Sequence, residues 1–588
     1  MKLALATLYA IPAAVLSALV LAFARGQLDP AIAATSLGLG AVVGAFSLWS
    51  ARAPGEKWSV DPWGGTALVV FALFALRSFL WLVFESGDSI WVFSPNNLGD
   101  LSLHLSYVRY LANGAPFWPE NPIFAGAPLT YPVGIDLLNS LLLLLGLDAL
   151  RGFVWVGLIG SACTAAMLWR WGRGFAVAGF LFAGGTLGFQ ILVEHRLVDY
   201  QSDAAWDGLI VAWKSLPLAI FVTQRGFLFA LPAGLALLAS WRARFLEPER
   251  RAQRLPLWGE WLLYAAMPVF HFHTFLFLSF IVAVWFCFVP AARRHLALVV
   301  ALAFVPATAL VWCVTGGFHA ASMIGWLPGW MQPRGEDARF FGIVWFWISN
   351  FGAFLPLTAW LLWRIARRRE PLPVALLAVP GVVVFVVCCF VKFAQWEWDN
   401  TKLMIWAYLI VLPAMWAALR RQREWVQVVA CVLLFFSGAA SLIGGLAGTL
   451  VTGEDRAAAQ QPLIGYPLAT RSEVEGAAWA TRGIPITDRF IANPNYNHPL
   501  LLAGRLVTMG YEGHVASHGL GFAERKADVE RVLNGEPGWR ETAQRLGARW
   551  LFWGEQERGA YPDSPQPWRD ECRVRTAGEW GTLYDLGK

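Results

Sequence analysis

Two polar residues in the loop between residues 85 and 134 could carry acid–base chemistry. Asp100 and His104 are four positions apart, which places their side chains on the same face of a helix. A carboxylate beside a membrane surface is well placed to act as a general base on a hydroxyl group. The alternative is that Asp100 only caps a helix. Arg109, Glu120 and Tyr131 are further candidates in this loop for contacts with a substrate.

A second group of polar residues lies just before an apolar run that begins near residue 403. It comprises Trp396, Glu397, Asp399, Asn400 and Lys402. Aromatic faces pack on sugar rings, and a lysine can hold a phosphate group. The alternative is an interfacial aromatic belt that contains a local ion pair.

Two histidines, His271 and His273, interrupt a long apolar stretch. Residues two positions apart do not share a helical face, so the spacing predicts a turn here rather than one continuous helix. Two imidazoles without a fixed carboxylate are weak evidence for a metal site. The histidines are therefore candidates for substrate contacts, with hydrogen-bonded buried histidines as the alternative.

The loop 194–225 contains carboxylates at a regular interval. Asp199, Asp203 and Asp207 recur every four residues and would line one face of a helix. Such a face could bind a divalent cation, but a solvated acidic face is the preferred interpretation. Arg225, near the end of the loop, is a plausible phosphate anchor. Near the C-terminus, residues 493–498 with His514 and His518 could contact a ligand, and a structural role is equally compatible with them.

The composition shows what kind of molecule must position these residues. Of 588 residues, 57% are hydrophobic and only 15% are charged, whereas soluble domains carry about 25% charged residues. We therefore expect a polytopic membrane protein. Apolar runs that could cross a bilayer occur near residues 3–24, 31–50, 64–84, 150–169, 175–193, 217–240, 295–315, 341–363, 372–391, 403–419 and 425–449, and the stretch 256–290 is interpreted as two short helices. This gives about 13 spans, the first of them interpreted as an uncleaved helix.

The basic residues predict the orientation of these spans. They cluster at 52–57, 170–173, 242–254, 293–294, 364–369 and 420–423. With Lys2 inside, one count of spans places every cluster on the cytoplasmic side. The long loops 85–134, 194–216 and 316–340, and the chain after residue 450, then lie outside. This scattered charge is not a nucleic-acid signal, and the seven cysteines form no disulfide framework or zinc spacing.

Three segments outside the spans have their own structure. Residues 99–113 are predicted to form an amphipathic helix, with Leu101 and Leu105 on one face and Ser102 and Ser106 on the other. Residues 135–147 are apolar but too short to span, which indicates a re-entrant or interfacial helix. Helical patterns at 521–534 and 537–547 and an apolar run at 550–553 predict a small α/β domain outside the membrane.

The loop 85–134 resembles the first periplasmic loop of bacterial GT-C glycosyltransferases, which use polyprenyl-phosphate sugars. The resemblance rests on Asp100 after a core helix, the helix to Asn113 followed by Gly114, the aromatic stretch 117–122, and the step Pro128-Leu129-Thr130-Tyr131-Pro132. It implies two additional N-terminal helices over 1–63, a GT-C-like transmembrane core over 64–450 and a periplasmic α/β domain over 451–588. The implied location is a bacterial inner membrane.

The resemblance also implies an activity. A sugar would move from a polyprenyl-phosphate donor to a hydroxyl acceptor on a glycan, lipid or protein, with inversion and with Asp100 as the general base. Lys402, Arg225 and Arg109 would neutralise the leaving phosphate. No cofactor is certain, although a divalent cation could share that task. The alternatives are a lipid or glycan transporter or flippase, for which no matching halves are visible, and a non-catalytic cell-envelope assembly protein.

Overall fold

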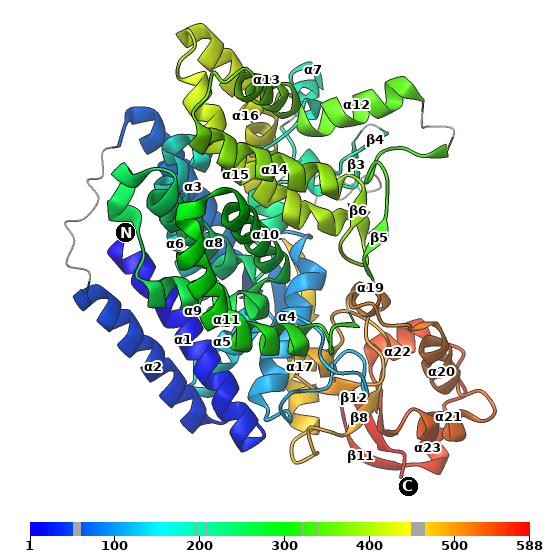
Figure 1. Ribbon diagram of the computed structural model, residues 1–588. Coiled ribbons are helices and arrows are strands. Elements are labelled where there is room, and N and C mark those ends of the chain that lie inside the picture. Colours follow the sequence, from blue (N-terminus) through cyan, green and yellow to red (C-terminus); the bar gives the residue numbers. More distant parts are fainter. Residues whose placement is uncertain are drawn as a thin grey trace.

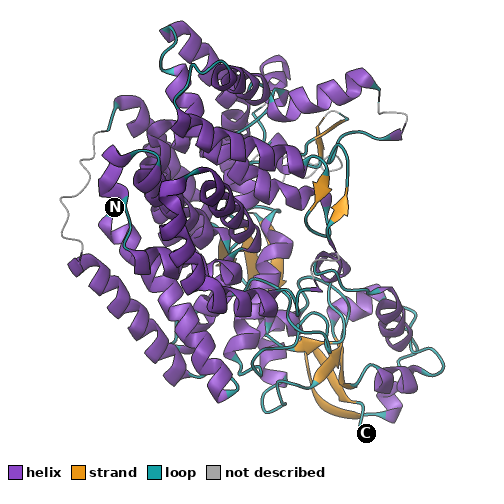
Figure 2. Ribbon diagram, in the orientation of Figure 1, coloured by secondary structure: helices purple, strands orange, loops and turns teal. Residues whose placement is uncertain are grey.

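The computed structural model of the chain describes residues 1–50, 60–194, 197–206, 208–319, 323–335, 339–448 and 465–587. It is mainly helical, and its five-stranded sheet lies in the C-terminal part (Figure 2). Seven described helices are long and apolar enough to cross a membrane: α1 (Lys2–Arg25), α2 (Pro30–Ser50), α3 (Pro62–Leu80), α6 (Ala149–Phe182), α11 (Arg293–Val314), α15 (Thr401–Leu419) and α16 (Glu424–Ala447). The chain is therefore a membrane protein, as its composition predicts.

The remaining apolar helices are too short to be counted with these seven or, in the case of α8 with its 19 residues, not apolar enough. They are α8 (Phe227–Phe245), α9 (Leu257–Phe270), α10 (Phe272–Phe288), α12 (Phe340–Phe351), α13 (Phe354–Ala366) and α14 (Leu372–Cys388). The break between α9 and α10 falls at His271, which confirms the predicted turn. The predicted span 341–363 is wrong as a single helix, because α12 and α13 meet at 87°.

Three other predicted spans also differ from the structure. The segments 150–169 and 175–193 are joined in α6, whose backbone leaves helical geometry only at Gly172 and Arg173. The second arm of α6 ends at Phe182, well before residue 193. The span predicted from residue 217 starts as a π-helical turn at Leu216–Phe221 and becomes α-helical only at Phe227. The described helices that are long and apolar enough to cross a membrane are therefore fewer than the 13 or so predicted spans.

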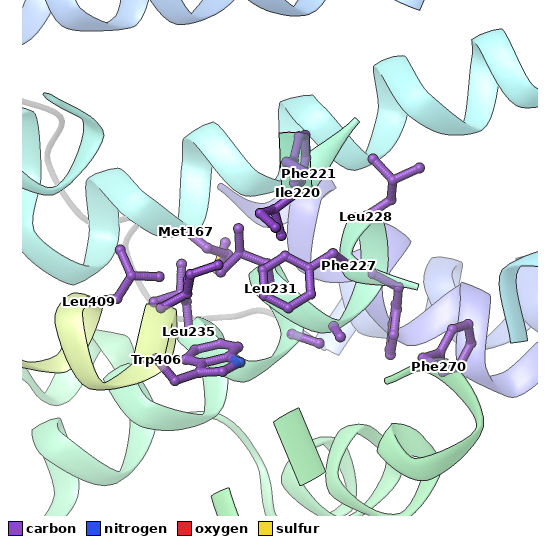
Figure 3. Close-up of a cluster of buried hydrophobic side chains, with 14 of the residues drawn as sticks. Met167, Ile220, Phe221, Phe227, Leu228, Leu231, Leu235, Phe270, Trp406 and Leu409 are labelled. Carbon is purple, nitrogen blue, oxygen red and sulfur yellow. The ribbon is translucent and has the colours of Figure 1, made fainter. Parts of the chain in front are cut away.

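The core of the helical part surrounds α8. Its residues from Phe227 to Ala243 are all buried, although ordinary helices leave one stripe exposed. Figure 3 shows its side chains packed between α6, the π-helical turn, the end of α9 and α15, through Met167, Ile220, Phe221, Phe227, Leu228, Leu231, Leu235, Phe270, Trp406 and Leu409. This packing fixes the backbone next to Arg225. Gly226 allows it, because a Cβ there would lie 1.9 Å from the carbonyl oxygen of Phe270.

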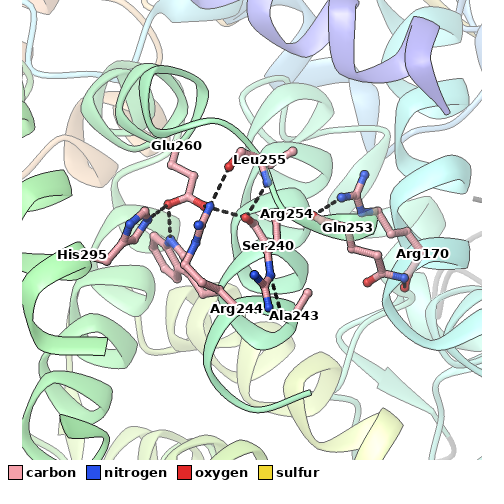
Figure 4. A network of polar contacts seen from close by, with 10 residues as sticks. Arg170, Ser240, Ala243, Arg244, Gln253, Arg254, Leu255, Glu260 and His295 are labelled. Carbon is pink, nitrogen blue, oxygen red and sulfur yellow. Dashed lines mark hydrogen bonds and ion pairs between the residues drawn. The ribbon is translucent and has the colours of Figure 1, made fainter. Parts of the chain in front are cut away.

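A polar network joins α8, α9 and α11 at one end of the bundle (Figure 4). The buried carboxylate of Glu260 accepts hydrogen bonds from Ser240 at 2.5 Å and Trp241 at 3.1 Å. It also contacts Arg244 at 3.2 Å and His295 at 2.6 Å. Its oxygens are thus used by protein partners, which is the usual condition for burying a carboxylate. The network joins the predicted basic cluster 242–254, through Arg244, to the start of α11, through His295.

The loop 85–134 and the segment after it contain two strands and two helices. They are β1 (Val83–Ser86), β2 (Ser89–Val92), α4 (Asn97–Ala112) and α5 (Gly134–Leu144). Both predicted helices are therefore confirmed. The hairpin β1–β2 extends to β7 (Tyr466–Thr470), which pairs with β2 in antiparallel register. The chain after residue 465 is thus attached directly to this loop.

The C-terminal part contains a five-stranded mixed sheet, as predicted for an α/β domain. Its strand order is β11 (Arg573–Gly578), β12 (Gly581–Asp585), β10 (Ala548–Trp553), β8 (Arg489–Ile491) and β9 (Leu506–Val507). The pairs β10–β8 and β8–β9 are parallel, and the others are antiparallel. The helices are α17 (Arg471–Ala480), α18 (Pro499–Leu502), α19 (Glu512–Ser517), α20 (Ala523–Leu533), α21 (Trp539–Arg545), α22 (Glu555–Ala560) and α23 (Trp568–Glu571). Figure 1 shows this part lying against one end of the helical bundle, beside α4.

The polar face of α4 is covered by this C-terminal part. Arg109 donates a hydrogen bond to the carbonyl oxygen of Leu502 at 2.7 Å, and Asn113 donates to that of Ala503 at 3.0 Å. Gly504, with φ of +75°, lets the two backbones approach, since a Cβ there would lie 2.5 Å from the backbone of Arg109. Ser102 and Ser106 are buried as well. The amphipathic helix is therefore covered by protein on both faces.

The regular acidic spacing in the loop 194–216 does not produce a helical face. The described segment forms a 3-10 turn at Tyr200–Ser202, followed by a hairpin of β3 (Ala205–Trp206) and β4 (Leu209–Ile210). Asp199 is buried and accepts hydrogen bonds from Ser202 and from Ser441, the latter at 2.6 Å. The prediction of a helical acidic face is therefore wrong. Asp207, together with the basic cluster 52–57, lies outside the described residues.

Candidate active site

Asp100 lies in the first turn of α4, and its side chain is half-buried. The N-cap of this helix is Asn96, so Asp100 is not the capping residue. Burial raises the pKa of the Asp100 carboxyl above its usual range, while the nearby charges of His104, Lys402 and Arg225 act to lower it. These three residues come from three separate elements. The Asp100 carboxyl therefore interacts electrostatically with side chains from α4, from the residues just before α8 and from the start of α15.

His104 forms a buried pair with a carboxylate that the sequence analysis did not select. Its Nδ1 lies 2.8 Å from Oδ1 of Asp136 on α5, and both side chains are almost fully buried. This bond fixes the imidazole ring beside Asp100. The available signal was a single carboxylate in an otherwise apolar short helix, because an ionisable residue in such a segment usually has a partner or a function.

Arg225 is a buried cation without a hydrogen-bond partner in the part of the chain that the structure describes. Only 1% of the residue is exposed, and Nε, Nη1 and Nη2 have no partner among the described residues. The guanidinium lies 5.1 Å from the centroid of the Phe153 ring. Its positive charge acts to lower the pKa of the Asp100 carboxyl. A buried cation that leaves its donors unused is costly. Its planar guanidinium has a fork of donors that matches the oxygens of a phosphate group. This geometry is compatible with the predicted role of Arg225 as a phosphate anchor.

The start of α15 carries the second cation of the site. Nζ of Lys402 lies 2.8 Å from Oδ1 of Asp399 and 5.3 Å from the centroid of the Trp398 ring. Asn400 supports this turn, since its side chain donates to the carbonyl oxygens of Cys388 and Val391 and accepts from the backbone of Phe393. The position of Lys402 is thus held by its carboxylate partner and by the turn η8 (Glu397–Asn400).

The two histidines of the α9–α10 turn face this same region. Nδ1 of His271 contacts the Thr274 hydroxyl at 2.8 Å, which orients the ring. Nε2 of His271 and Nε2 of His273 are buried and have no hydrogen-bond partner among the described residues. Both rings lie within the electrostatic reach of Lys402. They therefore offer unused ring nitrogens beside the two cations.

The C-terminal part contributes to the other side of α4. The rings of Tyr131 and His518 are stacked, with centroids 5.3 Å apart. His518 also contacts the Tyr107 hydroxyl at 3.4 Å and the Asn121 amide at 3.0 Å. A Cβ on residue 99 would lie 3.1 Å from Nε2 of His514, so the glycine that precedes Asp100 admits this second histidine. Both histidines are ligand candidates in the sequence, but their pattern predicts no mechanism.

Four of the predicted site residues have other contacts in the structure. Arg109 binds the C-terminal part, as described above, and Glu120 accepts from the backbone of Gly126 at 2.7 Å and pairs with Arg489 at 3.4 Å. Glu397 pairs with Arg334 at 3.2 Å, and Trp396 is exposed. The structure therefore brings together Asp100, His104, Arg225, Asp399 and Lys402 with the two histidines, and places these four residues toward the periphery.

No group of three or more His, Cys, Asp or Glu side chains within the described ranges is arranged to hold a metal ion. The carboxylates of the site are instead bound to a histidine or a lysine, as with Asp136 and Asp399. The groups available for chemistry at the site are the Asp100 carboxylate, the two cations Arg225 and Lys402, and the imidazoles of His104, His271 and His273.

Comparisons with known proteins give distant likenesses only. No family model matches the chain, and no curated protein matches it in sequence. Among solved structures, it is similar to the apo form of the Archaeoglobus fulgidus oligosaccharyltransferase, with a TM-score of 0.46 and 11% identity over 85% of this chain and 70% of that one. The same enzyme in complex with zinc and sulfate gives a TM-score of 0.46 and 12% identity over 83% and 67%.

Proposed function

We propose that the protein is a membrane glycosyltransferase that moves a sugar from a polyprenyl-phosphate donor to a hydroxyl acceptor. The observation that carries this proposal is the buried guanidinium of Arg225, which has unused donors and lies within electrostatic reach of Asp100. A phosphate group would satisfy those donors, and a carboxylate at short range could take a proton from an attacking hydroxyl. The Arg225 guanidinium and the Asp100 carboxyl, whose charges interact, would then serve the displacement of a lipid phosphate.

Asp100 is proposed to be the general base. As the acceptor oxygen attacks the anomeric carbon, the bond from that carbon to the phosphate oxygen breaks and the acceptor proton passes to the Asp100 carboxylate. A raised pKa helps a carboxyl group to keep the proton it receives. Because the attack is direct, the configuration at the anomeric carbon is inverted. His104, held by Asp136 at 2.8 Å, gives this carboxylate a fixed neighbour.

Arg225 and Lys402 are proposed to stabilise the leaving phosphate. Charge develops on the phosphate oxygens as the sugar–phosphate bond breaks, and placed cations favour that transition state. Lys402 is already paired with Asp399, whereas Arg225 has no hydrogen-bonded partner among the described residues. Arg225 is therefore the stronger phosphate anchor, and the free ring nitrogens of His271 and His273 are placed to contact the sugar or the phosphate.

The proposal includes a location. Figure 1 shows the C-terminal part, beside α4, at the lower end of the bundle, and α13, whose Arg364 joins the Arg364–Glu370–Arg421 group, at the upper end. Under the positive-inside rule the arginines face the cytoplasm. The site would then face the periplasm of a bacterial inner membrane, with residues 64–450 as the catalytic core, residues 1–63 as two additional helices and residues 451–588 as a periplasmic domain. The acceptor would be a glycan, a lipid or a protein of the cell envelope.

The test is mass spectrometry of lipids and glycans from cells that lack the protein, complemented either with the wild-type chain or with Asp100→Asn. We expect a polyprenyl-phosphate sugar to accumulate without the protein and with Asp100→Asn, and to be consumed with the wild type. A matching loss of one sugar from an envelope glycan, lipid or protein identifies the acceptor. If wild-type and Asp100→Asn cells contain the same lipid-linked sugars and the same glycans, the proposed function is wrong.

A further inference from the structure

Helix α12 presents an exposed face of large apolar side chains. Phe340 is 74% exposed, Phe341 83% and Trp345 46%. Val344 and Ile348 continue the same face at helical spacing and are exposed as well. The helix contains no charged residue along its length. Fully burying one such side chain is worth about 1.5–3 kcal/mol, so a face of five needs an apolar environment.

The bend between α12 and α13 limits where that environment can be. The two helices meet at 87° around Gly352, whose φ is +50°. The far end of α13 lies at the basic cluster 364–369, where Arg364 and Arg421 both bind the Glu370 carboxylate at 2.6 Å. If α13 runs across the bilayer from that side, α12 must run along the plane of the membrane. Figure 1 shows α12 projecting sideways from the helical bundle.

The length of α13 sets the depth of α12. Its 13 residues rise about 20 Å at 1.5 Å per residue, whereas the hydrocarbon core is about 30 Å thick. Helix α12 would therefore lie about 10 Å below the far edge of the hydrocarbon, which is compatible with the depth of about 5–10 Å that interfacial helices reach. Absence of charge from α12 agrees with this depth, and the exposed Arg339 before its first turn can extend to the headgroups.

The opposite face of α12 is attached to the candidate site. Trp347 donates a hydrogen bond to Gln332 at 3.3 Å, and Phe346 packs edge-on to Trp330 with ring centroids 6.3 Å apart. Trp330 in turn donates to the carbonyl oxygen of Glu397 at 2.8 Å, three residues before Asn400. The helix is thus connected through Trp330 to the turn that precedes Lys402.

We propose that α12 is a membrane-embedded, in-plane helix in the leaflet opposite Arg364 and Arg421, and that lipid acyl chains cover its face from Phe340 to Ile348. The inference does not depend on the proposed function. In this arrangement α12 does not cross the membrane, which distinguishes it from one half of a broken transmembrane span. Through Trp330, the position of α12 in the membrane would influence the turn that precedes Lys402.

The test places a photo-crosslinking residue on this face in the full-length protein. Phe341→p-benzoylphenylalanine and Trp345→p-benzoylphenylalanine are prepared separately, reconstituted in nanodiscs of phosphatidylethanolamine and phosphatidylglycerol, and irradiated. The same residue at Val305, exposed in the middle of α11, provides the lipid-facing reference. At Ala527, exposed on α20, it provides the water-facing reference. Intact-protein mass spectrometry counts the phospholipid adducts.

We expect positions 341 and 345 to form phospholipid adducts at a yield comparable to position 305 and several-fold above position 527. A yield equal to that at position 527 would show that water covers the face and would overturn the proposal. Crosslinking to a second copy of the chain, visible as a dimer on denaturing gels, would overturn it too, because protein rather than lipid would then cover α12. Lipid adducts at position 305 but not at positions 341 and 345 would also overturn the proposal, because lipid would then not cover α12.

Discussion

Nδ1 of His104 and Oδ1 of Asp136 lie 2.8 Å apart in a region where both side chains are almost fully buried. Leaving one buried partner of a hydrogen bond unsatisfied costs about 1–3 kcal/mol. We therefore expect Asp136→Ala to lower the thermal unfolding midpoint of the purified protein in detergent. The double variant His104→Ala/Asp136→Ala should lose less than the sum of the two single variants, because the pair acts as a unit. Additive losses would contradict a direct interaction.

Asp100→Asn should abolish sugar transfer and leave the fold intact. Asparagine retains most of the volume and hydrogen bonds of aspartate but cannot accept a proton at neutral pH. Loss of a general base typically costs about 10²–10⁴-fold in rate. The measurement is product formation by the purified variant with a polyprenyl-phosphate sugar, with donor binding and thermal unfolding as controls. Near-wild-type turnover would remove Asp100 as the base and direct attention to Glu397 or Asp399.

Arg225→Met should weaken binding of the donor lipid more strongly than it reduces stability. Methionine keeps an apolar stem in the buried site and removes the charge and the donors that have no hydrogen-bond partner among the described residues. A hydrogen bond to a charged group contributes about 1.5–3 kcal/mol, so we expect the donor dissociation constant to rise by at least tenfold.

The matched control for Arg225→Met is Arg242→Met. Arg242 is also buried, but its guanidinium is used by Glu247 at 2.7 Å and by the carbonyl oxygen of Trp171 at 3.2 Å. This variant should lose stability with unchanged donor affinity. If both variants bind the donor like the wild type, the phosphate assignment of Arg225 is wrong.

Reporter fusions test the orientation of the helices. Fusions at about residue 247 and about residue 367 should read cytoplasmic, and a fusion at about residue 500 should read periplasmic. The reason is the clustering of arginine at 242–254 and 364–369. A cytoplasmic reading at residue 500 would place the C-terminal part, and with it the candidate site, on the wrong side for the proposed function.

Local patterns in the sequence predicted those parts of the site that depend on neighbouring residues. The four-residue interval between Asp100 and His104 placed both on one face of α4, and the interval between His271 and His273 predicted the turn that the structure shows. These relations follow from helical geometry over a few residues. They needed no knowledge of distant contacts.

The parts that were not predicted depend on long-range contacts. The polar face of α4 indicated exposure to water, yet its partner is a backbone segment about 390 positions away at Leu502–Gly504. Asp136 was overlooked because its short helix is otherwise apolar, and its meaning appears only with His104 beside it. The bend between α12 and α13 was missed because hydropathy reports composition and not direction.

His518 makes the attachment of the C-terminal part to α4 sensitive to acid. Burial, together with the neighbouring His514, lowers the pKa of His518 to about 3 in the folded protein, against an ordinary histidine value of about 6.5. The unfolded chain therefore takes up a proton at a pH at which the folded chain does not. The stability contributed by neutral His518 is complete above about pH 6.5 and is lost as the pH falls toward 3, at up to about 1.4 kcal/mol per pH unit.

His518→Gln should make stability less dependent on pH. Glutamine can still accept the hydrogen bond that the Asn121 amide donates at 3.0 Å in the wild type, but it does not titrate. We expect the variant to be less stable than the wild type at pH 7, and the difference between them to shrink as the pH falls from 6.5 to 5, where few carboxylates yet protonate. The measurement is the thermal unfolding midpoint in detergent at half-unit steps of pH. His319→Gln, which replaces an exposed histidine outside this contact, is the matched control. Parallel curves for the wild type and His518→Gln would show that His518 is not the group whose protonation weakens this contact.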